Sequence, residues 1–148
     1  FLNKNDFPSD AVQYAIWVFS DNHQLSSVTT ATGKDITPLI NTISKIKKLP
    51  VPWYKLVYQQ DSSRVFTDRP VRLTGEIKYF VNKNTIISIV VKSKAGEIIA
   101  SPVMGSAIGS GEYHYYLDID VTEWVRGEYR LEVLEEYSRV NTSKSFKL

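Results

Sequence analysis

The chain has 148 residues, no cysteine, and a formal net charge of +2 from 18 Lys and Arg against 16 Asp and Glu. A chain of this length buries about 68–70% of its unfolded surface, which suits one well-packed domain or one domain with a small attachment. The lack of cysteine excludes a disulfide framework and thiolate chemistry. No apolar run reaches the roughly 18 residues that span a bilayer. Residues 1–50 carry 5 Lys and 4 Asp, so neither half is a basic segment for nucleic acid.

The stretch Ala11–Phe19 fits two structures. Ala11, Tyr14, Ala15 and Val18 recur at helical spacing, which predicts a helix capped by Ser9. The dense run of β-favouring residues from Ile16 to Phe19 favours a strand instead. Such a strand is apolar on both faces, so it would be central in a sheet or donated into a neighbouring subunit. In either case the apolar side chains are candidate interface residues: Val12, Tyr14, Ile16, Trp17, Val18 and Phe19.

A second helix is predicted over Pro38–Lys48. Isoleucine and leucine recur there at spacings of three and four, Asp35 or Thr37 can cap the start, and Pro38 suits the first turn. Pro50 and Pro52 then disfavour helix and favour an extended exit. The sequence therefore predicts a boundary near residue 50, between an N-terminal helical or donor-strand region (1–50) and a β-domain (51–148).

From Val51 onward the apolar pattern changes to a period of two, which predicts strands. The expected strands cover 53–59, 63–66, 71–79, 85–91, 97–104, 113–119, 129–133 and 143–148. The glycines and serines of 105–111 predict a flexible loop between two of them. Seven or eight strands at this spacing are typical of a mainly β, immunoglobulin-like (Ig-like) antiparallel β-sandwich, here with one or two short helices in a small N-terminal region.

Several segments share a recurring Gly-turn and strand pattern. They are Phe66–Gly75, Ile87–Ile99, Gly111–Tyr115, Trp124–Val133 and Ser143–Leu148. Together they resemble the macroglobulin-type or carboxypeptidase-regulatory-like Ig-like modules of secreted and archaeal cell-surface proteins, over residues 63–148. The resemblance implies a β-sandwich that presents surfaces or sheet edges.

No cluster of residues is expected to be catalytic or to bind a cofactor. The two histidines, His23 and His114, lie far apart in the sequence and are expected to be surface residues. Three carboxylates near one strand end, Asp118, Asp120 and Glu123, could hold Ca²⁺ through oxygen ligands. They lack the Asp-x-Asp-x-Asp-Gly pattern, and a solvated acidic turn is the competing interpretation.

Two surface features have their own interpretations. Tyr113, Tyr115 and Trp53 are expected to lie on an aromatic surface, which suits either a protein interface or the stacking of surface glycans. Asn141-Thr142-Ser143 is an acceptor for N-glycosylation in a predicted turn.

The expected function is that of a non-enzymatic extracellular structural subunit. Because the chain starts at Phe1 rather than Met, we expect a processed, secreted protein. Identical subunits would assemble into a surface filament or layer by strand or segment exchange, with Ala11–Phe19 or the Phe1–Phe7 arm as the donated segment. The alternative is a monomeric carbohydrate-binding or adhesive module.

Overall fold

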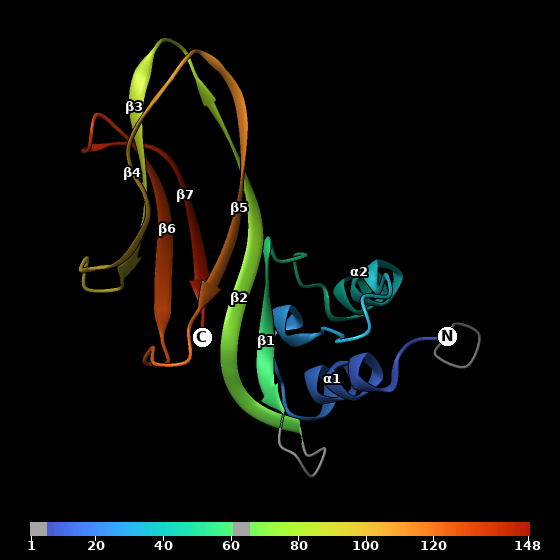
Figure 1. Cartoon of the computed structure of the whole chain (residues 1–148). Helices are drawn as coiled ribbons and strands as arrows, with labels where there is room; N and C mark the ends of the chain where they lie inside the picture. Colours follow the sequence, from blue (N-terminus) through green and yellow to red (C-terminus); the bar gives the residue numbers. More distant parts are fainter. Residues whose placement is uncertain (1–5, 61–65) are drawn as a thin grey trace. The chain divides into compact units, whose positions relative to one another are not determined.

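A computed structural model describes residues 6–60 and 66–148. This part of the chain is mainly β, with seven strands, two α-helices and one short 3₁₀ helix, η1 (Leu25–Ser27). The strands form two sheets of antiparallel strands, in the orders β1-β2-β5 and β4-β3-β6-β7, consistent with a β-sandwich (Figure 1).

The chain divides into two compact units, which are described separately below. The first comprises residues 1–75 and 118–122, and the second comprises residues 76–117 and 123–148. The units therefore do not divide at the boundary predicted near residue 50. The reason is that β1 (Tyr54–Gln60) pairs with the first half of β2 (Phe66–Val81), and the 3₁₀ helix contacts β1, so this hairpin folds with the N-terminal helices.

The stretch Ala11–Phe19 lies in helix α1 (Ser9–Ser20), which confirms the helical alternative, and the alternative of a strand over 11–19 is wrong. Ala11, Tyr14, Ala15 and Val18 form one buried stripe, which a helix can bury on a single face. Ser9 is not the cap, because Pro8 holds that position and no side chain caps the helix.

Helix α2 (Thr37–Lys47) confirms the second predicted helix. The Asp35 carboxylate accepts a hydrogen bond from the Thr37 backbone N–H at 2.9 Å, and Lys48 ends the helix with a φ of 54°. In Figure 1 both helices lie beside β1. The apolar core of the first unit joins the two helices, η1 and the loop between them: Ala11, Tyr14, Ala15, Val18, Leu25, Val28, Ile36, Leu39, Ile40 and Ile43.

Strands β1 and β2 form a hairpin that pairs from Tyr54 opposite Gly75 to Gln60 opposite Phe66, with register shifts on both sides of Tyr58. Gly75 is needed there, since a Cβ at this position would lie 2.8 Å from the Trp53 ring. Most of the strand predicted over 63–66 lies outside the described residues, and β2 begins at Phe66.

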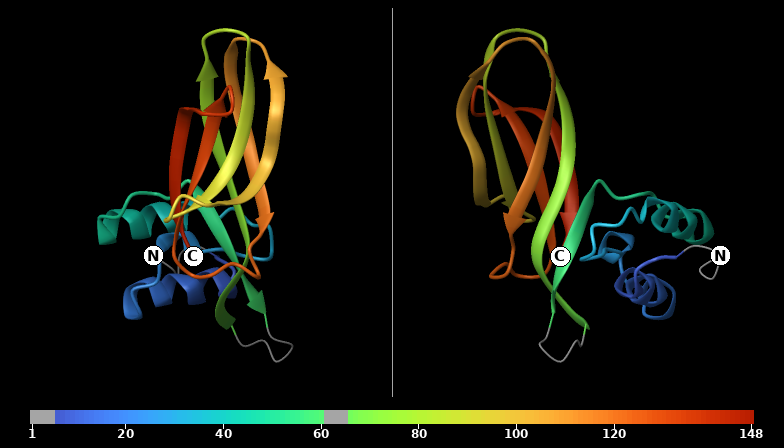
Figure 2. Two further views of the ribbon diagram at one scale, coloured as in Figure 1. Left: turned by 90° about the vertical axis from the view of Figure 1, so that its left-hand side faces the viewer. Right: turned by 45° about the vertical axis from the view of Figure 1, so that its right-hand side comes forward.

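The second unit contains the four-stranded sheet of β3 (Thr85–Ser93), β4 (Ile98–Ile108), β6 (Glu128–Glu135) and β7 (Arg139–Lys147). Both views in Figure 2 show β6 and β7 side by side, and Tyr129 opposite Phe146 fixes their register. Residues 76–81 of β2 and 111–117 of β5 (Gly111–Asp120) also belong to this unit. Its core consists of alternate residues: Ile77, Val81, Ile87, Ile89, Val91, Leu117, Tyr129, Leu131, Val133 and Phe146.

The flexible loop predicted over Gly105–Gly111 is not present as such. Strand β4 continues to Ile108 and pairs with β3 there, and β5 starts at Gly111, so only Gly109 and Ser110 lie between the two strands. Gly105, with a φ of +65°, sits inside β4 near an irregularity in the register. Gly105 therefore lies at an irregular position of β4, and Gly109 lies in the tight turn between β4 and β5.

Candidate interaction site at the sheet edges

The predicted interface residues of α1 divide into two groups. Tyr14 and Val18 are buried in the core of their own unit. This differs from the burial against another copy that the sequence pattern predicts. Val12 and Trp17 are half-buried. Ile16 and Phe19 remain 46% and 47% exposed. The Nζ of Lys47 on α2 lies 5.6 Å from the centre of the Phe19 ring.

The acidic residues proposed for Ca²⁺ have other partners or lie apart. Asp118 receives two hydrogen bonds from the Arg72 guanidinium, at 2.5 and 2.7 Å, which lower its pKa. Asp120 accepts from the Thr122 backbone N–H at 2.8 Å, and this contact with Thr122 lowers its pKa. Glu123 belongs to the other unit. Within residues 6–60 and 66–148, no group of three acidic, histidine or cysteine side chains could hold a metal ion.

The exposed aromatic residue of β5 is not one of those predicted. Tyr113 and Tyr115 point to the same side as buried Leu117 and are half-buried. Tyr113 stacks on Tyr79, with ring centres 5.5 Å apart, and burial raises the pKa of Tyr115. Tyr116 is 70% exposed on the opposite face. The prediction of Tyr113 and Tyr115 as an open platform is therefore corrected, because strand alternation turns them inward.

Trp53 is also half-buried, and it lies in the first unit. Its ring lies against Tyr54, with ring centres 5.4 Å apart, and over the backbone of Gly75. Trp53 therefore packs within its own unit instead of presenting an open ring.

A polar pair that the sequence analysis did not predict lies on the exposed face of β5. The His114 Nδ1 and the Glu76 Oε1 are 2.5 Å apart, and both side chains are partly exposed. Tyr116 lies two residues further along the same face. Only the pairing of β2 with β5 brings Glu76 to His114, and the sequence carries no signal for that register.

The glycosylation acceptor lies in a strand rather than in a turn. Asn141 lies in β7. Its neighbours Val140 and Thr142 pair with the adjacent residues Leu134 and Val133 of β6, so Asn141 is the extra residue of a β-bulge. Its side-chain nitrogen donates to the Phe80 carbonyl oxygen at 2.7 Å. This bond links β7 to β2, across the two sheets.

Four strands end the two sheets, β1, β5, β4 and β7, and they differ in how they are protected from pairing with another chain. Long end strands invite such pairing, and Pro, bulges and lysines oppose it. Strand β1 spans seven residues, carries Lys55 and shifts register twice against β2. Strand β4 spans 11 residues without a charged side chain, but it contains Pro102 and three register shifts. Strand β7 spans nine residues with Arg139, Lys144 and Lys147. Strand β5 spans 10 residues and contains neither proline nor a lysine or arginine.

A second feature absent from the sequence analysis is a row of neighbouring side chains across the four-stranded sheet, made of Met104, Ser88, Leu134 and Val140. The Ser88 hydroxyl contacts the Met104 sulfur at 3.5 Å, Ser88 pairs with Leu134, and Leu134 pairs with Val140. Ser88 and Leu134 are buried, whereas Met104 and Val140 are more than half exposed. The sequence predicted a strand over 85–91, but it did not indicate which side chains cover the second face of that strand.

No protein family matches the chain, and comparison with curated proteins and with solved structures finds no significant similarity. Among the described helices, none has the length and apolar character that a membrane crossing requires.

Proposed function

We propose that the chain is a non-enzymatic extracellular structural subunit whose copies assemble into a surface filament or layer through the edges of their sheets. Helix α1 already packs in the core of its own chain, so the proposal places the contact at end strands and not at a donated segment 11–19. The extracellular setting rests on the resemblance of residues 63–148 to modules of cell-surface proteins.

The division of the strands between the two sheets supports an Ig-like assignment. Sheets ordered β1-β2-β5 and β4-β3-β6-β7 divide seven strands three and four, as in Ig-like sandwiches. Tyr129 at the start of β6 donates its hydroxyl to the Val125 carbonyl oxygen at 2.5 Å. A tyrosine that bonds back to the preceding corner in this way is a hallmark of such domains.

The observation that carries the proposal is the edge of β5. A β-strand in a globular protein is usually about 5–6 residues long. This end strand has 10 residues, three of them tyrosines, with no proline, lysine or arginine. Its outer backbone groups are suited to pair with a strand of another copy.

Sedimentation velocity from micromolar to millimolar concentration tests the proposal. We expect the average mass to rise with concentration, and electron microscopy of the concentrated sample to show filaments or layers. A mass that stays at one copy across that range would contradict the proposal.

Exposed Tyr116 beside His114 and Glu76 favours one alternative, a monomeric carbohydrate-binding module. Sugar rings stack on exposed aromatic side chains, and neighbouring polar groups bond their hydroxyls. Glycan-array binding that is lost in Tyr116→Ala and kept in Phe19→Ala, a matched exposed aromatic in the first unit, would favour this alternative.

A further inference from the structure

We propose that β7 of one copy pairs with β5 of the next. This inference rests on the proposed function and names the two strands that meet. Each strand ends its sheet, β5 in the order β1-β2-β5 and β7 in the order β4-β3-β6-β7. The two edges differ in their charge, and this difference selects the pair.

The β7 edge is positive. The strand carries Arg139, Lys144 and Lys147 and no acidic residue. Arg139 is paired with Glu135 at 2.8 Å, so its charge is already balanced within the chain. Lys144 is exposed, and its cross-strand neighbour on β6 is the apolar Leu131. Lys144 therefore places a positive charge at this edge with no acidic residue opposite it on β6.

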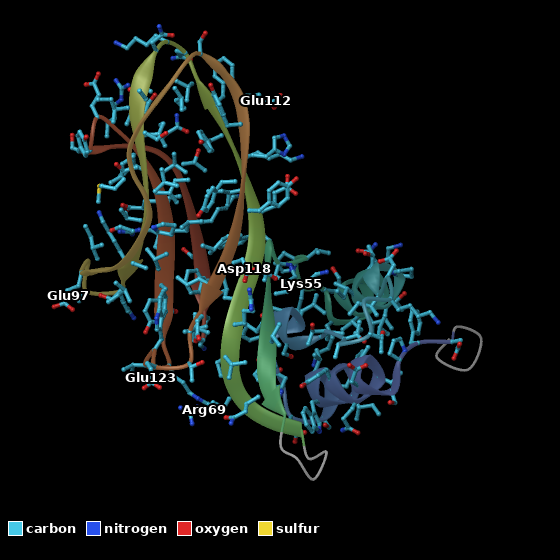
Figure 3. All side chains as sticks on the ribbon, viewed as in Figure 1. Lys55, Arg69, Glu97, Glu112, Asp118 and Glu123 are labelled. Carbon is cyan, nitrogen blue, oxygen red and sulfur yellow. The ribbon has the colours of Figure 1, made fainter. Side chains whose placement is uncertain are left out.

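The β5 edge is negative. The strand carries Glu112, Asp118 and Asp120 and no lysine or arginine, and Glu112 and Asp118 are labelled in Figure 3. Asp118 is balanced by Arg72. Glu112 is exposed and lies near the start of the strand. Glu112 on β5 and Lys144 on β7 are therefore two exposed charges of opposite sign on the two edges.

Charge complementarity selects this pairing over the pairing of like edges. Two β7 edges would place lysines together, and two β5 edges would place carboxylates together, both of which are destabilising. Strand β4 has no charged side chain that could select a partner, and Pro102 interrupts it. The lysines of β7 oppose pairing with a like edge but attract an acidic one, and the bulge of β7 at Asn141 lies before Lys144. A contact between two different edges of the same molecule leaves one free edge on each copy. Further copies can therefore be added, which gives a closed ring or an open filament.

Charge reversal in the full-length chain tests the pairing. Lys144→Glu and Glu112→Lys change exposed side chains, and Lys83→Glu, in the turn between β2 and β3, is the matched control. At low salt we expect each of the first two variants to associate about tenfold more weakly than the wild type. Lys83→Glu should associate like the wild type, and added salt should weaken the wild-type contact.

Mixing then identifies the partner strands. In an equimolar mixture of Lys144→Glu and Glu112→Lys, β7 of each variant can meet a β5 of opposite charge on the other variant. Association should therefore recover. The double variant, with both changes in one chain, should also recover association.

The outcomes separate the inference from the proposed function. Wild-type protein that never associates overturns both. Wild-type protein that associates while both reversed variants associate equally well overturns the pairing of β7 with β5 and leaves assembly through another surface. Loss of association in the single variants without recovery in the mixture also overturns the pairing, because the two charges then do not meet.

Discussion

The Tyr129 hydroxyl donates to the Val125 carbonyl oxygen, 2.5 Å away, and ties the turn before β6 to the core of the second unit. The Tyr129 ring is buried and stacks on Phe146, with ring centres 5.5 Å apart. One side chain therefore fixes both the entry into β6 and the register of β6 with β7.

Tyr129→Phe should destabilise the chain by about 1 kcal/mol, the usual net value of one hydrogen bond. The ring stacking is kept in this variant, so the loss measures the hydroxyl alone. Urea denaturation of the variant and of Tyr116→Phe, an exposed control, provides the comparison. Equal midpoints for Tyr129→Phe and the wild type would show that the bond does not contribute.

Gly75→Ala should cost about 1–3 kcal/mol, because the new methyl group would lie 2.8 Å from the Trp53 ring and 3.0 Å from its carbonyl oxygen. Gly109→Ala is the matched control, since the nearest atom there is Asn84 Oδ1 at 3.6 Å. Thermal unfolding measures both. In the double variant Trp53→Ala and Gly75→Ala the two costs should not add, because the clash with the ring is gone.

Asp10→Asn should destabilise the first unit by about 1–3 kcal/mol. The buried Asp10 carboxylate accepts from the backbone N–H of Ala11 and Ala31 at 2.8 Å and from the Thr30 hydroxyl at 2.9 Å. Ala11 and Thr30 donate to Oδ1 and Ala31 donates to Oδ2, so an amide whose oxygen takes the place of Oδ1 leaves the Ala31 N–H without its acceptor. Hydrogen exchange at the Ala31 amide should become faster. The control is Asp21→Asn on the exposed end of α1, and unchanged exchange at Ala31 would contradict the prediction.

Asp118 should titrate below the ordinary pKa of an aspartate, because of the hydrogen bonds and the charge of Arg72. A carboxylate with a lowered folded pKa stabilises the fold above its unfolded pKa, and this contribution is lost as the pH falls through the folded pKa. Arg72→Gln should therefore raise the pKa of Asp118 toward its ordinary value, as followed by carboxyl carbon shifts in NMR.

Asp120 is the internal control for that titration. Its pKa is lowered chiefly by the hydrogen bonds from Thr122, and Arg72 contributes least among the causes. It should stay low in Arg72→Gln. An Asp118 pKa that does not move in this variant would show that the arginine is not the cause.

Local patterns predicted much of the secondary structure. The spacing of Leu39, Ile40 and Ile43 predicted α2, and alternation predicted the strand over 71–79 that lies in β2, because these patterns depend on residues a few positions apart. The stretch 11–19 fitted two structures. Its helical form follows from packing against α2 and Val28, which are distant in the sequence.

Tertiary contacts also decided the candidate site. The sequence indicated that β5 is amphipathic, but its two faces both carry tyrosines, so the pattern alone could not say that Tyr116 is exposed and Tyr113 is stacked on Tyr79. In the same way, the acceptor at Asn141 was visible as a triplet. Its position in a bulge, bonded to Phe80, depends on the pairing of β7.

The sequence by itself determined that the chain is mainly β with short N-terminal helices, and that β5 and β7 differ in charge, since both follow from residue types and their period. Only the tertiary structure decided that these two strands end their sheets, that α1 fills its own core, and that Arg72 neutralises Asp118. Strand order and long-range pairing join residues that are far apart in the chain, and no local pattern encodes which of them meet.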